Sequence, residues 1–65
     1  MKVEFQHSTG RSTLLGLSGN IPQDWRGSEV ILDGERFRTE IVYDLPGHIA
    51  IIGKGDFVGK QIQFI

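Results

Sequence analysis

Apolar residues recur at every second position along much of this chain, and turn-forming residues interrupt them at intervals of about one strand length. A period of two places successive side chains on opposite faces of a β-strand. No segment longer than one turn carries the 3.6-residue period of a helix. Short strands between regular turn signals are typical of a small sandwich or barrel, so the pattern predicts an all-β protein.

The length and the lack of cysteine limit how such a fold can be stabilised. The chain has 65 residues and no cysteine, so we expect one domain over residues 1–65, without disulfides or thiolate metal sites. A chain this short buries only about 60% of the surface that its unfolded state exposes. Good local strand pairing or self-association is therefore expected to reinforce it.

The first two strands are predicted at the N-terminus. In residues 2–7 the side chains of Val3, Phe5 and His7 share one face, which we expect to be buried. A turn follows at residues 8–11, where Gly10 tolerates a positive φ. The second strand, over residues 12–19, places Thr13, Leu15 and Leu17 on one face.

The strongest local signal lies within residues 28–45. Asp33-Gly34 between strand-forming residues predicts a two-residue hairpin turn of the primed type. Beyond it the side chains alternate, so we expect a bend or bulge in what is a long run for one strand. One face carries Phe37, Thr39, Ile41 and Tyr43, and the other carries Arg36, Arg38 and Glu40.

The C-terminal third predicts two more strands. Pro46-Gly47 indicates a type II turn, and the strand after it, at 48–53, is apolar on both faces and is expected to be central. The last strand, at 57–64, places Val58, Ile62 and Phe64 on one face. These elements predict a small antiparallel barrel, SH3-like or OB-like, of five or six short strands, with at most one 3₁₀ turn near residues 22–26.

The stretch GKGDFVGKQ at residues 53–61 is glycine-rich and contains two lysines, as phosphate-binding loops often do. A Walker-type loop would need Gly at Lys54 and Ser or Thr at Gln61. The dinucleotide fingerprint fails as well, because Gly59 stands one position too late. Both motifs also require a following helix, so we interpret the stretch as a hairpin in which Gly59 marks a bulge or a close backbone approach.

Residues 20–28 form the longest stretch without strand character, and they contain the single tryptophan. Pro22 is expected to open one helical turn that Gly27 ends. Trp25 either caps one end of the barrel with its ring buried or stands exposed as an anchor for a partner. Ile21, Trp25 and Arg26 are the predicted partner-binding residues.

A weak single-stranded nucleic-acid-binding barrel is the alternative. Basic side chains on strands and turns can contact phosphates while an aromatic ring stacks on bases. Seven Lys and Arg against eight Asp and Glu argue against a dedicated nucleic-acid binder, and outward charges also guard strand edges. The residues of this alternative are Trp25, Arg26, Arg36, Arg38, Lys54 and Lys60.

Neither catalysis nor cofactor binding is expected. His7 and His48 share no metal-ligand spacing, and no nucleophile stands in the G-x-S-x-G pattern. A chain of this size also leaves little room for a pocket that excludes water. The sequence predicts no catalytic residue, no metal and no cofactor.

The first function hypothesis is a non-enzymatic binding or adaptor module that acts through protein–protein contacts. No signal peptide or membrane-spanning stretch is visible, so we expect a soluble, cytoplasmic protein that does not bind membranes and a chain that is complete as given. The partner is an unidentified protein. The final strand also offers an edge through which two copies could pair as a homodimer.

Overall fold

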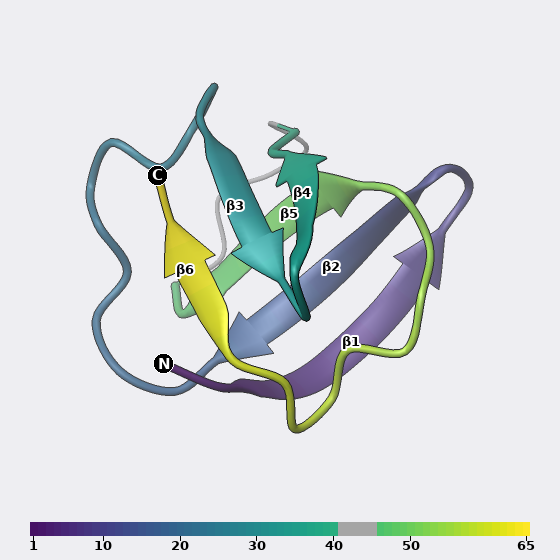
Figure 1. Ribbon diagram of the computed structural model, residues 1–65, viewed down its shortest axis with the longest axis horizontal. Helices are drawn as coiled ribbons and strands as arrows, with labels where there is room; N and C mark the ends of the chain where they lie inside the picture. The colour runs from purple at the N-terminus through teal and green to yellow at the C-terminus, as the bar shows by residue number, and fades with distance from the viewer. Residues whose placement is uncertain (41–45) are drawn as a thin grey trace.

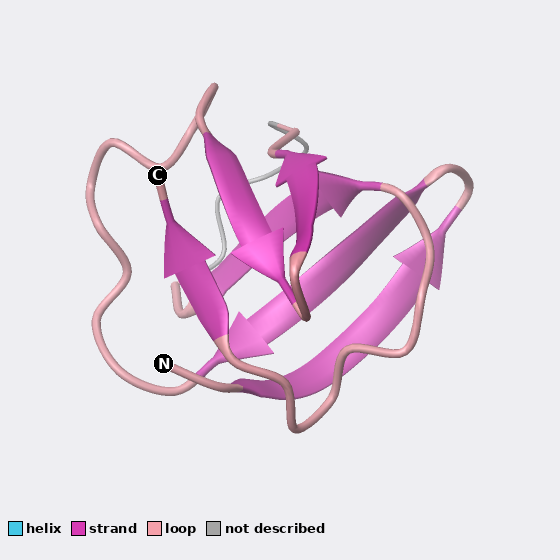
Figure 2. Cartoon of the chain, in the orientation of Figure 1, coloured by secondary structure: helices cyan, strands magenta, loops and turns pink. Residues whose placement is uncertain are grey.

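The computed structural model describes residues 1–40 and 46–65 and shows an all-β fold. Within these residues the chain forms strands and turns and no helix (Figure 2). No described helix therefore provides the length and apolarity needed to span a membrane. The strands are β1 (Val3–Thr9), β2 (Ser12–Leu17), β3 (Glu29–Leu32), β4 (Glu35–Arg38), β5 (His48–Ile52) and β6 (Ile62–Phe64).

The strands make two antiparallel sheets of three strands each. One sheet has the order β1-β2-β5 and the other the order β4-β3-β6. In Figure 1 the second sheet lies in front of the first, and the strands of the two sheets cross at a steep angle. The number of strands and their antiparallel pairing are as the sequence predicts.

Two isolated bridges join the sheets, one between Lys2 and Gln61 and the other between Thr39 and Ile51. Backbone hydrogen bonds accompany them: Ile62 N–H donates to Met1 O at 3.0 Å, and Glu40 N–H donates to Ala50 O at 2.9 Å. The continuous ladders stay within the two sheets in the part of the chain that the structure describes. The fold is therefore two small sheets that isolated bridges join at their edges, and the predicted closure into a barrel is not shown.

The core lies between the inner faces of the two sheets. The alternation along β2 and β3 is the reason: Leu15 and Leu17 point inward from one sheet, and Val30 and Leu32 from the other. The buried cluster consists of Val3, Leu15, Leu17, Trp25, Val30, Leu32, Phe37, Ile49, Ile51, Phe57 and Ile62.

The predicted hairpin turn at Asp33-Gly34 and the predicted turn at residues 8–11 are both confirmed. Asp33 and Gly34 have φ values of 52° and 81°, the two positive angles of a type I′ turn. Leu32 pairs with Glu35 directly across it. Gly10 likewise has a φ of 56°, at the turn where Thr9 pairs with Ser12.

The prediction for the face of β1 is wrong beyond Val3. Val3 is buried, but Phe5 is 51% exposed and His7 is exposed as well. The cause is a register shift between Val3 and Phe5, since one inserted residue moves all later side chains to the opposite face. Gln6 therefore takes the position that Phe5 was expected to occupy.

The prediction for the long run at 28–45 is confirmed as far as the structure describes it. Phe37 and Thr39 are buried, while Arg36 and Arg38 are exposed. The run does not stay in one sheet, because β4 ends at Arg38 and Thr39 bridges to the other sheet. The expected inward positions of Ile41 and Tyr43 lie outside the described residues.

The prediction for β5 is only half right. Ile49, Ala50 and Ile51 are all buried, so the strand is covered on both faces as expected. It is not central, however, because β2 is the middle strand of its sheet. Segment 39–40, rather than a full strand, pairs with the other edge of β5.

The glycine-rich stretch at 53–61 is not a hairpin. It carries the chain from β5 to β6, which belong to different sheets, and β6 pairs with β3. The last strand is accordingly shorter than predicted: Val58 is 50% exposed, and Phe57 is the buried residue. Gly59, expected at a bulge, lies in a turn with a φ of 87°.

Two aromatic rings and the side chain of Gln6 hold this connection in place. The rings of Phe37 and Phe57 pack edge to face with centroids 5.2 Å apart. A Cβ at Gly53 would lie 2.9 Å from the Phe37 ring, and one at Gly55 would lie 2.6 Å from the Phe57 ring. The side-chain amide of Gln6 donates to Gly55 O at 2.8 Å and accepts from Phe57 N–H at 2.6 Å. The amide thus makes the hydrogen bonds between β1 and this connection that a paired strand would otherwise make.

We expect Gly53→Ala to destabilise the fold more than Gly34→Ala. Both glycines have positive φ, but a Cβ at Gly34 meets nothing within 4 Å. Gly34→Ala should cost only the conformational term of about 1 kcal/mol, whereas Gly53→Ala adds overpacking of about 1–3 kcal/mol. Urea unfolding midpoints measure both, and equal losses would show that the Phe37 ring moves aside freely.

Candidate functional site

The connection between β2 and β3 is anchored at Trp25. The carbonyl oxygen of Trp25 accepts from Ser28 N–H at 3.2 Å, from Ser28 Oγ at 2.5 Å and from Thr39 Oγ1 at 3.1 Å. Turns rather than a 3₁₀ helix occupy this segment, and Gly27 has a φ of 80°. Three bonds to one carbonyl fix the position of the tryptophan in the loop.

Trp25 is 7% exposed and belongs to the core, so the side chain is buried, which agrees with one part of the capping interpretation. The Arg26 guanidinium lies over the ring, 4.9 Å from its centroid, at a distance typical of a cation–π contact. Ile21 is partly buried and packs against the same core. Trp25 is therefore not a freely exposed anchor.

The three predicted partner-binding residues do come together, because they line one pocket of about 290 Å³. Pro22 of the same loop lines it as well, and Pro46 and His48 close it from the start of β5. Leu17 N–H donates to Gly47 O at 2.9 Å, which brings the two segments side by side. The wall of the pocket combines aliphatic, aromatic and proline surface with the polar side chains of Gln23, Arg26 and His48.

Pro46 and His48 were missed as members of this site. Pro46 was interpreted only as a turn residue, and the φ of 76° at Gly47 fits that turn. What joins them to the loop is the pairing of β2 with β5, in which Gly16 lies opposite His48. No local sequence signal reports this long-range pairing.

His48 has two contacts at the edge of the pocket. Its Nδ1 lies 2.9 Å from Pro46 O, and since a carbonyl can only accept, Nδ1–H is the donor. Its ring also packs edge to face with Phe5, with centroids 6.3 Å apart. His7 lies on β1, two strands away from β5, and among the described residues no group of His, Asp and Glu side chains forms a metal cluster.

The residues of the nucleic-acid alternative are divided among several places. Trp25 and Arg26 are in the pocket, where the indole is buried. Arg36 pairs with Glu29 at 3.2 Å, and Lys60 pairs with Asp33 at 3.5 Å. Arg38, on β4, and Lys54, after β5, are both exposed.

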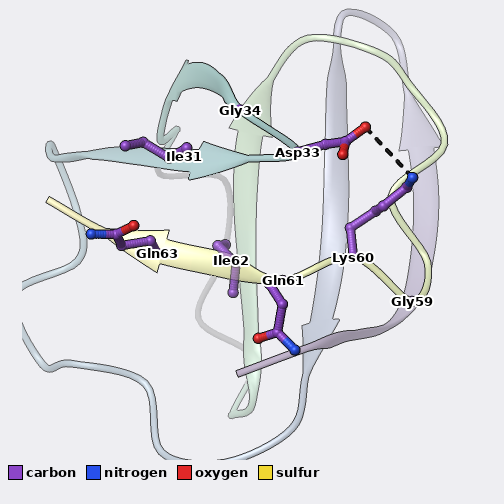
Figure 3. Close-up of a pocket in the computed structure, with 8 residues that line it drawn as sticks. All are labelled: Ile31, Asp33, Gly34, Gly59, Lys60, Gln61, Ile62 and Gln63. Atoms are coloured by element: carbon purple, nitrogen blue, oxygen red, sulfur yellow. Dashed lines mark ion pairs between the residues drawn. The ribbon is translucent and has the colours of Figure 1, made fainter.

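Lys60 lines a second, larger groove on the outer side of β3 and β6, with a volume of about 540 Å³ (Figure 3). Ile31 faces it from β3, and Gln61 and Gln63 follow from the C-terminal segment. Gln61 Oε1 accepts from the N-terminal amine at 3.2 Å. Sequence reasoning did not single out this groove, since its members come from the turn region at 31–34 and from the C-terminal segment at 59–63.

Glu40 is the one described residue whose pKa clearly departs from its ordinary value. The pKa of the carboxyl is lowered, first because Ser12 Oγ donates a hydrogen bond to it and further because of Arg11, while partial burial opposes the shift. Arg11 Nη2 lies 3.2 Å from Glu40 Oε1. The three residues connect the first hairpin to the segment after β4.

We expect the Ser12–Glu40 contact to make stability dependent on acid pH. A folded-state pKa below the unfolded one, roughly 4.3 for glutamate, means that the contact stabilises the fold above that pH. The stabilisation is lost as the pH falls through the folded-state pKa. Ser12→Ala should therefore lower Tm at pH 7, and the difference from the parent chain should shrink below about pH 4.

Thermal unfolding monitored by circular dichroism between pH 3 and pH 7 measures this difference. Ser8→Ala, at an exposed serine of β1, is the matched control and should leave Tm nearly unchanged. A constant Tm difference at all pH values would contradict the assignment to the Glu40 carboxylate.

Comparisons with known proteins identify no relative of this chain. No protein-family model, no curated protein and no solved structure matches it.

Proposed function

We propose that this protein is a small non-enzymatic binding module whose pocket receives an apolar side chain of a protein partner. The observation that carries the proposal is the convergence of Ile21, Trp25 and Arg26 with Pro46 and His48 around one pocket. Arg is enriched in interface hot spots, and Arg26 lies over the buried ring of Trp25 at this pocket. Arg26 and Trp25 lie in a loop that hydrogen bonds hold in place. The pocket beside them is lined by apolar and by polar side chains.

The size and lining of the pocket support this kind of ligand. A volume of about 290 Å³ lies at the lower limit of small-molecule sites, which span roughly 300–1,000 Å³. Neither a carboxylate nor a hydroxyl nucleophile is among the described residues that line it. His48 is the one acid–base side chain among these described lining residues, and no carboxylate or hydroxyl nucleophile stands beside it in the pocket, so we favour binding over catalysis.

We also propose that the two sheets act as one small, SH3-like barrel. The bridges between Lys2 and Gln61 and between Thr39 and Ile51 support it, because each joins an edge of one sheet to an edge of the other. A homodimer through β6 is less favoured. Residues 1–3 already take hydrogen bonds along that edge, with Val3 N–H donating to Lys60 O at 3.0 Å.

Titration with N-acetyl-leucinamide, a minimal mimic of a partner's apolar side chain, tests the proposed pocket. We expect NMR shifts at the Trp25 indole N–H and at His48, with a Kd in the millimolar range typical of fragments (about −4 kcal/mol). Ile21→Ser removes an apolar wall of the pocket and should weaken binding at least about threefold.

Ile31→Ser is the matched control for this titration. Ile31 is also a half-buried isoleucine, but it faces the other groove. Shifts that are absent, or that depend on Ile31 instead of Ile21, would refute the pocket as the binding site.

The fluorescence of Trp25 tests the nucleic-acid alternative. The indole is buried and Arg26 lies over it, so we expect no quenching by single-stranded DNA or RNA at low salt. Quenching that fades as salt increases would instead show stacking supported by phosphate contacts, and it would replace the protein-binding proposal.

A further inference from the structure

Phe5 presents an exposed aromatic ring beside the pocket. It is 51% exposed, although large apolar side chains are normally the first to be buried. The register shift after Val3 turns it outward, and bulges often re-aim a side chain in this way near functional sites. Its ring packs edge to face on His48, so its position is defined.

Gly16 makes this pairing of rings possible. In the sheet it lies between Phe5 on β1 and His48 on β5. A Cβ at this position would lie 3.2 Å from Phe5 Cβ and 3.3 Å from His48 Nε2. Gly16 has no positive φ, and glycine weakens a central strand, so the space it leaves for the two rings is its structural contribution.

His48 connects the exposed ring to the pocket. It lines the pocket together with Ile21 and Trp25, and its ring contacts Phe5 on the outer face of the sheet. The pocket and Phe5 therefore adjoin and form one surface of aliphatic, aromatic and polar side chains. We call this surface, from Ile21 through His48 to Phe5, the Phe5–pocket surface.

The size of this surface decides what kind of partner it fits. A standard interface between folded proteins buries about 800 Å² on each side and includes about 20–30 residues. That area would be about a fifth of the 4073 Å² that the whole chain exposes. The eight residues that line the pocket, together with Phe5, are far fewer, so a folded domain or a second copy would find too little area here.

We propose that the Phe5–pocket surface binds a short extended segment of a partner protein, with one apolar side chain in the pocket and a second against the Phe5 ring. This inference rests on the proposed function and specifies the partner of the same site. Gly16 acts as a positioning residue, since it touches neither side chain of the partner segment but sets where the Phe5 and His48 rings lie.

The test begins with linear random peptides displayed on phage and selected on the wild-type protein. The best selected peptide is then synthesised, and its Kd is measured by fluorescence polarisation. Phe5→Ser should weaken binding at least about tenfold, because an aromatic contact is lost at the centre of a small interface. Gly16→Ala should weaken it to a smaller extent and shift the NMR signals of both the Phe5 and His48 rings.

Val58→Ser is the matched control, since Val58 is 50% exposed and lies outside the Phe5–pocket surface; it should change the Kd less than about twofold. Binding that is lost in Ile21→Ser but retained in Phe5→Ser would overturn the inference and leave the proposed pocket standing. Failure to select any peptide would also overturn it, while the leucinamide titration judges the pocket independently.

Discussion

The contact between the inner faces of the two sheets is the interaction on which the rest of the fold depends. Isolated two-stranded hairpins are marginal in water, and this chain has no cysteine with which to fasten them. The first residues of the chain hydrogen-bond to the segment before β6, with Gly59 N–H donating to Val3 O at 2.8 Å. The two ends of the sequence thereby connect opposite sheets, so the sheets cannot separate without breaking these hydrogen bonds.

Aromatic rings fill the space that glycines leave at three places in this fold. The ring of Phe37 lies over Gly53 and that of Phe57 over Gly55, and these two rings close the core. Gly16 is the third case, but its neighbours Phe5 and His48 are on the outer face of the sheet. The same steric arrangement therefore completes the core on one side and shapes an exposed aromatic surface on the other.

Local sequence features predicted the local structure, and long-range pairing decided the remainder. The turn at Asp33-Gly34 needs two positive φ angles, and the types of these two adjacent residues are enough to predict them. The register shift after Val3, in contrast, reflects how β1 meets β2 and the residues at 59–60, which no window of the sequence contains. The path from β5 to β6 was mistaken for a hairpin for a similar reason: its glycines also occur in turns, and only the packing of Phe37 and Phe57 shows their other use.

The candidate site was partly predictable because half of it comes from one loop. Ile21, Trp25 and Arg26 are close in sequence, so an irregular segment with a tryptophan was enough to indicate them. Pro46 and His48 come from the start of β5, which the antiparallel pairing brings beside the end of β2, and Phe5 was expected to be buried. Phe5 points outward because one residue is inserted in β1, and the alternation of apolar and polar residues does not reveal where that insertion lies.

The small core also explains why recognition is expected at the rim of the molecule. Side chains of both sheets fill the space between them, so an internal ligand cavity would remove stabilising contacts that a chain of this size needs. The loop between β2 and β3 is held rigidly, because the Trp25 side chain is buried in the core and the Trp25 carbonyl oxygen accepts three hydrogen bonds. Rigid loops lose little conformational entropy on binding, so the residue that anchors the loop in the core would also favour binding of the proposed partner at Ile21, Arg26 and His48.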